Sequence, residues 1–557
     1  MRKPHVPRGP FASRRPSSRP VGRGGPAVRR SGSRTPWARA AGAVAAGALP
    51  ALAFPEPSLW WFAFVALVPW LLLLRTAGSA RRALAEGWLG GVGFMVAVHH
   101  WLFPSLHVFL LVLAALLGLL WAPWGWLVRS VAGGPPTTAR ALAALVLVPS
   151  GWLVIELVRS WQGLGGPWGL LGASQWQVGP ALRIASVGGV WLVSLLVVAV
   201  NTAVALLVAV PRVRVPVVAA AVAGAAAVAA VSAWAPGPRV GGGLRVLVVQ
   251  PGVVGGPDSV ERRFDRGERL TLGALERDAA PGLVVWGESS VGADLRDRPD
   301  LAERLAALAR RAGAPLLVNV DARSAGPAGA AAGIHKSAVL VGPDGPTGDR
   351  YDKMRLVPFG EYVPARGLLG WATSVGRAAG EDRLRGDSPV VMTLPDGPDA
   401  GARIGPLVCF ESAFPDMSRR LVRDGADLLV AQSATSSFQG SWAPGQHASL
   451  AALRAAESGR PVVHATLTGV SAVFGPTGLP VGAPLGTDTV GTAVYEVPGA
   501  TGTTLFVRFG EWPVWGALAA LAVAAAASAA RVRRRSAPGR AARRPRTARA
   551  SAGRPAR

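Results

Sequence analysis

The stretch RIGPLVCFES, residues 403–412, carries an apolar run into Cys409, which is the only cysteine of the 557-residue chain. A short apolar run of this kind is typical of a strand that is covered on both faces. A chain with a single cysteine cannot close an intramolecular disulfide, so the thiol is not a structural cross-link. The stretch therefore predicts a buried strand that ends at a reactive sulfur.

Similar runs recur between residues 243 and 508, where short β-segments alternate with Gly/Pro turns and helical patterns. This alternation predicts an α/β domain with layered sheets. Helices are expected over 299–312, 414–424 and 445–459. Strands are expected at 244–250, 282–289, 314–320, 336–345, 402–412, 426–433, 461–467, 470–478 and 504–509, the last with the sequence TLFVRF.

Two other segments of this domain carry charged residues of the kinds that activate a thiol. LVVWGES (283–289) ends a predicted strand with Glu288, and the loop-like YDKMRLVPFGEYVP (351–364) holds Lys353 and Glu361. A thiol of pKa ~8.5 is a poor nucleophile until a base takes its proton or a cation stabilises the thiolate. Glu288 has the chemistry of such a base, and Lys353 can stabilise first the thiolate and then an oxyanion.

The rest of the chain is dominated by long apolar runs, and half of all residues are hydrophobic. Runs of 18 or more apolar residues indicate membrane spans. Eight spans are predicted, and the first is the weakest because Pro50 and Pro55 interrupt it. The spans are expected at 37–54, 58–75, 82–103, 105–129, 138–158, 183–211, 214–235 and 512–531.

The formal net charge of +27 comes mostly from the two ends of the chain. Residues 1–39 and residues 531–557 each carry eleven Lys or Arg and no acidic residue. Both tails are rich in Pro, Ser, Gly and Ala, which predicts disorder. Basic segments beside spans mark the cytoplasmic side far more often than they mark nucleic-acid binding, so we expect no nucleic-acid partner.

Orientation follows from the same basic segments. With eight spans, the two tails and the loops at 75–82, 128–140 and 211–215 all fall on the cytoplasmic face of the cell membrane. The predicted organisation is a basic tail (1–36), a seven-span membrane domain (37–235), an extracytoplasmic catalytic domain (236–511), a last span (512–531) and a second basic tail (532–557).

Glu288, Lys353 and Cys409 follow one another in the order found in the nitrilase, or carbon-nitrogen hydrolase, superfamily, which the domain resembles. YDKMRLVPFGEYVP and CFES, together with IELVRSWQGLGGPWGLLG (155–172), resemble the membrane-embedded branch, the apolipoprotein N-acyltransferase family. The resemblance covers nearly the whole chain except the tails. It implies an αββα sandwich for the α/β domain.

The resemblance also implies the chemistry. Glu288, Lys353 and Cys409 would form a catalytic triad, supported by Glu361, Phe410 and Glu411, with no metal and no cofactor. A membrane phospholipid would donate an acyl chain to the Cys409 thiol. The free amine of a diacylglyceryl apolipoprotein would then accept it, which completes lipoprotein maturation.

Two loops depart from the family pattern, and both should border the substrates. PGVVGGPDSVERRF (251–264) lacks an expected tryptophan, and Phe264 is the nearest aromatic residue. The loop at 433–442 reads SATSSFQGSW in place of the usual Asn-Asp-x-Trp-Phe pattern.

Two alternatives stay open at this point. One is a membrane-anchored nitrilase-type amidase that hydrolyses its acyl-enzyme with water. The other is a non-catalytic scaffold whose partner is a glycosyltransferase that makes polyprenyl-phosphate mannose.

Overall fold

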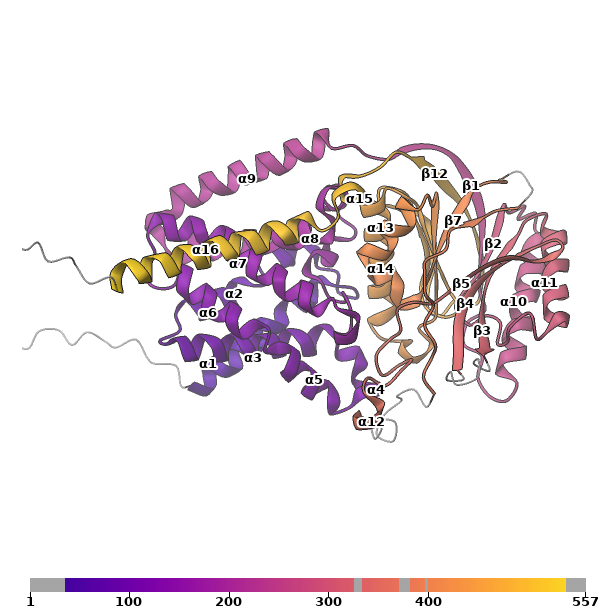
Figure 1. Cartoon of the computed structure of the whole chain (residues 1–557), viewed down its shortest axis with the longest axis horizontal. Helices are drawn as coiled ribbons and strands as arrows, with labels where there is room; N and C mark the ends of the chain where they lie inside the picture. The colour runs from indigo at the N-terminus through magenta and orange to yellow at the C-terminus, as the bar shows by residue number, and fades with distance from the viewer. Residues whose placement is uncertain (1–35, 325–332, 370–380, 396–398, 537–557) are drawn as a thin grey trace, which may run out of the picture.

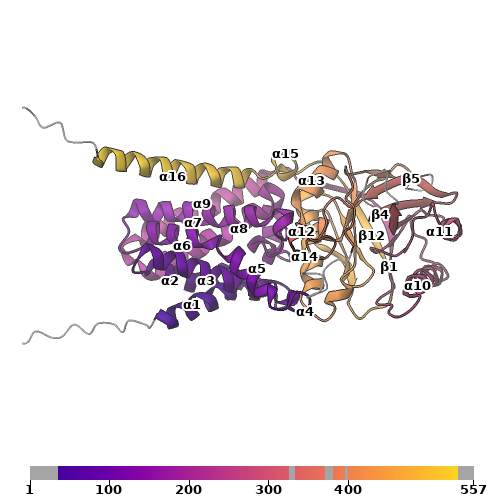
Figure 2. The same cartoon turned by 60° about the horizontal axis from the view of Figure 1, so that its bottom comes forward.

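The computed structural model describes residues 36–324, 333–369, 381–395 and 399–536, and it consists of a helical domain beside an α/β domain (Figure 1). Both ends of the described chain lie at the end of the helical domain that points away from the α/β domain (Figures 1 and 2). The predicted basic tails lie almost entirely outside the described residues.

The helical domain is built from residues on both sides of the α/β domain in the sequence. Its long helices are mostly Ala, Leu, Val and Trp, which explains why they pack into one apolar cluster. Its helices are α1 (Pro36–Ala48), α2 (Val68–Arg75), α3 (Ala80–Val98), α4 (Phe103–Leu106), α5 (Phe109–Gly118), α6 (Trp121–Ala132), α7 (Thr138–Arg159), α8 (Gly179–Ala209), α9 (Arg214–Trp234) and α16 (Trp512–Ser536).

Five helical segments in the described part of the chain are long and apolar enough to cross a membrane: 109–132, 138–159, 179–209, 211–234 and 512–534. A sixth is reached if α3 and the following 100–106 segment, which are bent by 64°, count as one span. Helix α1 has 13 residues, and at 1.5 Å per residue it falls short of a hydrocarbon core of about 30 Å. A membrane domain is therefore supported, while the number of eight spans stays a prediction.

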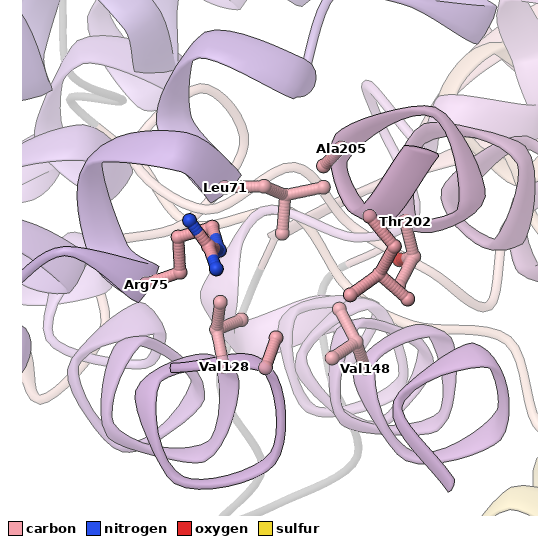
Figure 3. A pocket seen from close by; sticks show the side chains of 8 residues that line it. Leu71, Arg75, Val128, Val148, Thr202 and Ala205 are labelled. Carbon is pink, nitrogen blue, oxygen red and sulfur yellow. The ribbon is translucent and has the colours of Figure 1, made fainter. Parts of the chain in front are cut away.

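Two cavities of the helical domain are lined in part by arginine. Arg75, Arg129 and Arg140 line one hollow there together with Gly133 and Gly134. Arg75 also borders a second cavity of about 10 Å³ among Leu71, Val128, Val148 and Thr202 (Figure 3). Neither cavity is lined by a cysteine, a histidine or a carboxylate, so the hydroxyls of Ser130 and Thr202 that line them have no general base there, and neither cavity is a candidate active site.

The α/β domain consists of two six-stranded sheets packed face to face. The first has the order β12-β1-β2-β3-β4-β5 and the second the order β11-β10-β9-β8-β7-β6. The strands are β1 (Arg239–Gln250), β2 (Leu283–Trp286), β3 (Leu316–Ser324), β4 (Gly333–Gly342), β5 (Gly345–Asp352), β6 (Met392–Thr393), β7 (Arg403–Val408), β8 (Leu428–Ser433), β9 (Val462–Thr466), β10 (Ser471–Phe474), β11 (Pro480–Leu485) and β12 (Gly491–Thr501).

Helices cover the outer face of each sheet, which confirms the αββα layering. Fully buried aliphatic residues such as Val248, Val285 and Val408 fill the space between the sheets. Helices α10 (Ser259–Leu275) and α11 (Pro299–Ala312) pack on the first sheet, whereas α13 (Pro415–Arg423) and α14 (Ala443–Ser458) cover the second.

One predicted strand is wrong. TLFVRF at 504–509 forms the short helix α15 (Leu505–Phe509), because the Thr504 hydroxyl caps it by accepting a bond from the Val507 amide at 3.1 Å. Phe506 is fully buried and lies close to Gly189, where helix α8 is broken. The aromatic and β-branched residues of this segment favoured a strand prediction. In the structure Phe506 and Val507 are buried side chains of a helix instead. Helix α10 and strands β5, β6, β11 and β12 were not predicted.

Helix α14 lies between the second sheet and the helical domain and is almost completely buried. Its Gln446 side chain accepts from the indoles of Trp101 and Trp168, at 3.2 and 2.7 Å. Its Glu457 accepts from the Val190 amide at 2.7 Å, next to the break in α8. Buried polar groups cost free energy unless they are paired, so these bonds tie the two domains together.

The loop at 161–172 provides a second contact between the domains. Gly166 has a φ of +70°, and a Cβ added there would lie 2.6 Å from Phe410 and 2.8 Å from Phe414. Phe410 and Phe414 pack edge to face with their ring centroids 4.9 Å apart. Only a glycine allows this turn to approach the two rings so closely.

We predict that Gly166→Ala lowers the unfolding temperature of the protein more than Gly165→Ala does. Gly165 also has a positive φ, +99°, but nothing lies within 4 Å of its added Cβ. Both variants place a Cβ at a positive φ. The difference between their free energies of unfolding therefore measures the clash with the rings, which is about 1–3 kcal/mol for overpacking. Thermal unfolding in detergent checks this, and equal unfolding temperatures would contradict it.

Candidate active site

Cys409 stands at the point where β7 turns into a single 3₁₀ turn, Cys409–Ala413. Its φ is +51°, in the left-handed region that non-glycine residues rarely occupy. A residue held in this region costs on the order of 1–3 kcal/mol and persists only where its surroundings impose it. The half-buried thiol is thus turned out of the strand direction at the edge of the inter-sheet core.

Glu288 follows β2 in the facing sheet, and main-chain bonds hold it near the thiol. Its amide donates to the Ser433 carbonyl at 3.2 Å, at the end of β8. The Gln432 side chain donates to the Trp286 carbonyl at 2.8 Å. Because these bonds join the ends of β2 and β8, the Glu288 carboxylate reaches the Cys409 side chain and accepts a hydrogen bond from it.

Lys353 comes directly after β5 and is completely buried. Its Nζ lies 2.8 Å from Oε1 of Glu361 and 3.4 Å from Oε1 of Glu288. The second oxygen of Glu361 accepts from the Val357 amide at 2.8 Å, which fixes that carboxylate within its own loop. Glu288, Lys353, Glu361 and Cys409, separated by up to 121 positions in the sequence, therefore form one cluster.

The cluster strongly changes the acidity of its members. Burial and then the charge of Glu288 raise the pKa of Cys409 to about 12, and the Lys353 charge offsets this only in part. Burial favours the neutral form of Glu288, but Lys336 and Lys353 overcome it and lower its pKa to about 2. Burial would lower the pKa of Lys353, yet Glu361 and Glu288 raise it above its usual value. At neutral pH the resting site therefore holds a thiol beside an ionised carboxylate and an ammonium group.

Glu411 links the turn at Cys409–Ala413, called the cysteine turn, to the loop at 351–364 that holds Lys353, called the lysine loop. Its Oε1 accepts from the Tyr351 hydroxyl at 2.7 Å and from the amides of Met354 and Arg355 at 2.7 and 3.0 Å. Its Oε2 accepts from the Val408 amide at 2.8 Å. Burial raises the pKa of Glu411. The side chain connects the residue before Cys409 with the two residues after Lys353.

Two residues near the thiol were not included in the sequence-based site. Lys336 on β4 has its Nζ 3.4 Å from Oε1 of Glu288. His447 on α14 has Nε2 3.1 Å from the Cys409 carbonyl oxygen and 2.9 Å from Oγ of Ser412. The scarcity of lysine in this chain was the available signal for Lys336, whereas no pattern around His447 indicated its position.

The two divergent loops have different positions. Phe264 lies in α10 and packs against Trp286 in the core outside the first sheet, so it does not border the thiol. The loop at 433–442 instead faces the helical domain. Its Phe438 and Trp442 contact Trp101 and His100, with ring centroids 5.0 and 4.4 Å apart.

Glu156 and Arg159 support the 161–172 loop rather than each other. Glu156 accepts from the Leu171 amide at 2.7 Å and from the Trp152 indole at 2.9 Å. Arg159 donates to the carbonyl oxygens of Trp168 and Gly169. No ion pair within 4.0 Å joins these two described residues, so each contacts the loop separately.

Within the described residues, no group of three or more His, Cys, Asp and Glu side chains is arranged to hold a metal ion.

Comparisons with known proteins match both halves of the chain. The apolipoprotein N-acyltransferase N-terminal domain family matches residues 46–203, and the carbon-nitrogen hydrolase family matches residues 248–504. An apolipoprotein N-acyltransferase of Azotobacter vinelandii is 32% identical over 505 residues, which cover 85% of this chain and 92% of that protein. One of Geobacter metallireducens is 30% identical over 455 residues, covering 78% and 84%. Among solved structures, an amidase from Nesterenkonia sp. is 21% identical, covers 46% of this chain and 90% of its own, and has a TM-score of 0.32.

We predict that Glu411→Gln lowers both the stability of the protein and the reactivity of its site. The side-chain NH₂ group of the glutamine would face main-chain amides that now donate to the carboxylate, so at least one hydrogen bond would be lost. Hydrogen bonds to a charged group contribute about 1.5–3 kcal/mol. Tyr351→Phe removes one of the four bonds and should cost about 0.5–1.5 kcal/mol. Thermal unfolding in detergent compares the two, and a Gln variant as stable as the Phe variant would contradict the linking role of Glu411.

We also predict that the Cys409 thiol of the folded protein resists alkylation near neutral pH. With a pKa of about 12, its thiolate fraction at pH 8 is at least ~100-fold below that of a free cysteine. The iodoacetamide rate should rise about tenfold per pH unit beyond pH 9, whereas the rate for SDS-denatured protein levels off. If the alkylation rate of the folded protein levels off near pH 9, the pKa of the Cys409 thiol is not raised and the prediction is wrong.

Proposed function

The chain belongs to the apolipoprotein N-acyltransferase family, and from this premise we propose how its own residues carry out the reaction. Cys409 receives a fatty acyl chain from a membrane phospholipid as a thioester. It then transfers the chain to the N-terminal amine of diacylglyceryl-cysteine in an apolipoprotein. The observation that carries this proposal is the meeting of Glu288, Lys353 and Cys409 in one buried cluster.

In the first half-reaction the sulfur of Cys409 attacks the ester carbonyl carbon of the phospholipid. Glu288 takes the thiol proton as the carbon–sulfur bond forms, because the resting thiol is neutral and the carboxylate is ionised. Lys353 lies beside both groups and stabilises the oxyanion, a contribution of about 2.7–4 kcal/mol at such sites. The ester bond then breaks, and the departing lysophospholipid oxygen takes the proton from Glu288.

In the second half-reaction the uncharged amine of the apolipoprotein attacks the thioester carbonyl. Glu288 accepts a proton from the attacking nitrogen, and Lys353 again stabilises the oxyanion. The carbon–sulfur bond breaks as an amide forms, and the proton on Glu288 returns to the sulfur. General base catalysis of this kind contributes about 10²- to 10⁴-fold to the rate. No step uses a metal or a cofactor.

The supporting residues have positioning roles in this proposal. Glu361 holds Lys353 through the 2.8 Å contact, and Glu411 sets the distance between the cysteine turn and the lysine loop. Phe410 packs on Gly166 of the helical domain. This contact places the cysteine turn beside the part of the protein that meets lipid.

The location proposed for the site is the outer face of the cell membrane. Both ends of the described chain, which adjoin the predicted basic tails in the sequence, lie at the end of the helical domain away from the α/β domain (Figure 1). Basic residues favour the cytoplasmic side, so this arrangement supports an outer α/β domain, cytoplasmic tails and eight spans. The five domain boundaries derived from the sequence are part of the same proposal.

The proposal is tested by incubating the purified full-length protein with phospholipid that carries a labelled acyl chain. We expect a labelled thioester on Cys409 that hydroxylamine releases, and no label on Cys409→Ala. Adding a diacylglyceryl lipopeptide should move the label to its amine.

The same assay separates the alternatives. Release of free fatty acid with an unmodified lipopeptide would indicate an amidase-type hydrolase. If Cys409→Ala restored N-acylated lipoproteins in a deletion strain, the chain would act as a scaffold and the proposal would be wrong.

A further inference from the structure

Lys336 is a buried ammonium group beside the active site that the two half-reactions do not use. It lies on β4, and its side chain is 13% exposed. Its Nζ is 3.4 Å from Oε1 of Glu288 and 3.4 Å from Oδ1 of Asp321, and it also donates to the Ser289 hydroxyl. A buried lysine carries a large desolvation cost unless it is paired, so this position requires an explanation.

The surroundings of Lys336 hold its ammonium group at one point. Asp321 lies directly opposite Lys336 in the antiparallel pairing of β3 with β4. The Ser289 hydroxyl donates to Asp321 at 3.0 Å, and the Ser289 amide donates to Oδ1 of Asn319 at 2.9 Å. Ser289 itself has a φ of +54°, so the chain leaves Glu288 through a left-handed turn that directs this hydroxyl toward Lys336.

Lys336 and Lys353 approach the same carboxylate oxygen. Both Nζ atoms lie 3.4 Å from Oε1 of Glu288, one from β4 and the other from the end of β5. For each lysine, the closest contact with Glu288 is therefore to Oε1. The pair of cations thus holds this oxygen from two sides.

We propose that Lys336 is a positioning residue of the reaction, which holds Glu288 with Oε1 between two ammonium groups and keeps the base ionised in the resting enzyme. This inference depends on the proposed role of Glu288 as the proton acceptor.

The charges of the cluster support this role. Glu288 and Glu361 contribute two negative charges, and Lys353 and Lys336 contribute two positive charges. Without Lys336 the cluster would carry a net negative charge beside a sulfur that must itself become negative, and like charges at this range oppose ionisation. The pKa of Glu288 agrees with this role. After burial, the charge of Lys336 has the largest effect on this pKa, ahead of the charge of Lys353.

The other groups around Glu288 do not replace Lys336. Cys409 is neutral at rest because its pKa is raised to about 12. His447 on α14 faces the site, and burial lowers its pKa to about 4, so it is uncharged at neutral pH. Asp321 is partly exposed and pairs with Lys336 itself. Among the described residues, Lys336 and Lys353 are thus the two cations in contact with Glu288.

The test measures thioester formation on the full-length protein in single turnovers between pH 5 and pH 9. Lys336→Met and Lys336→Gln remove the charge, Lys336→Arg keeps it, and Arg323→Met removes an exposed charge from the neighbouring strand as the control. Loss of the Lys336 charge raises the pKa of Glu288, so the base becomes protonated at higher pH. The unaltered protein, in which the pKa of Glu288 is about 2, should show no acid limb of Glu288 in this range, whereas the two neutral variants should show one above pH 5.

At neutral pH the two neutral variants should form the thioester about 10- to 100-fold more slowly, with the phospholipid concentration at half-maximal rate unchanged. Lys336→Arg should keep the pH profile of the unaltered protein and most of its rate, and Arg323→Met should match it in both. A purely structural role would lower the unfolding temperature and the amount of active enzyme, and no acid limb would appear above pH 5.

A folded Met or Gln variant that shows no acid limb between pH 5 and pH 9 would overturn the inference. If only one of the two neutral variants folds, the pH profile of that variant decides the outcome. If neither folds while Lys336→Arg does, Lys336 is required for folding and the inference is wrong. If the unaltered protein forms no thioester, the proposed function fails instead, so the two failures are distinct.

Discussion

The structure depends on one buried ammonium group, that of Lys353, which lies between the carboxylates of Glu361 and Glu288. An isolated charge in this position would be very unfavourable, and removing one partner of a buried pair typically costs about 3–5 kcal/mol. The lysine loop must therefore close over the ends of β2 and β7, where Glu288 and Cys409 emerge. Electrostatic pairing therefore adds to the apolar packing between the sheets in bringing these three segments together.

The positions of the sheet ends make that pairing possible. Bonds from Gln432 to Trp286 and from the Glu288 amide to Ser433 join the ends of the two sheets, so the gap between them is narrow at this edge. Glu411 then sets the separation of the cysteine turn and the lysine loop with four hydrogen bonds. The left-handed φ of Cys409 is maintained by this framework, in accordance with the view that strained backbone persists where its surroundings over-determine it.

The contact between the two domains links this site to the lipid-facing part of the molecule. Helix α14 is buried between the second sheet and α8, and it carries both Gln446, bonded to two tryptophans of the helical domain, and His447, bonded to the Cys409 carbonyl. Gly166 allows the helical domain to touch Phe410, the neighbour of the nucleophile. A change in the packing of the helical domain would therefore reach the cysteine turn through one helix and one loop.

The sequence by itself determined the layered α/β domain, the apolar helical domain and the identity of the residues at two strand ends, because burial and turn chemistry leave local periodic patterns. It also identified Lys353 and Glu361 as charged residues that share one loop-like segment of this domain. Only the tertiary structure decided that Lys336 contacts Glu288, that His447 touches the Cys409 turn, that Glu156 and Arg159 support a loop, and that residues 505–509 form a helix. These outcomes depend on strand register, sheet order and cap geometry, which bring together residues far apart in the chain and therefore leave no local pattern.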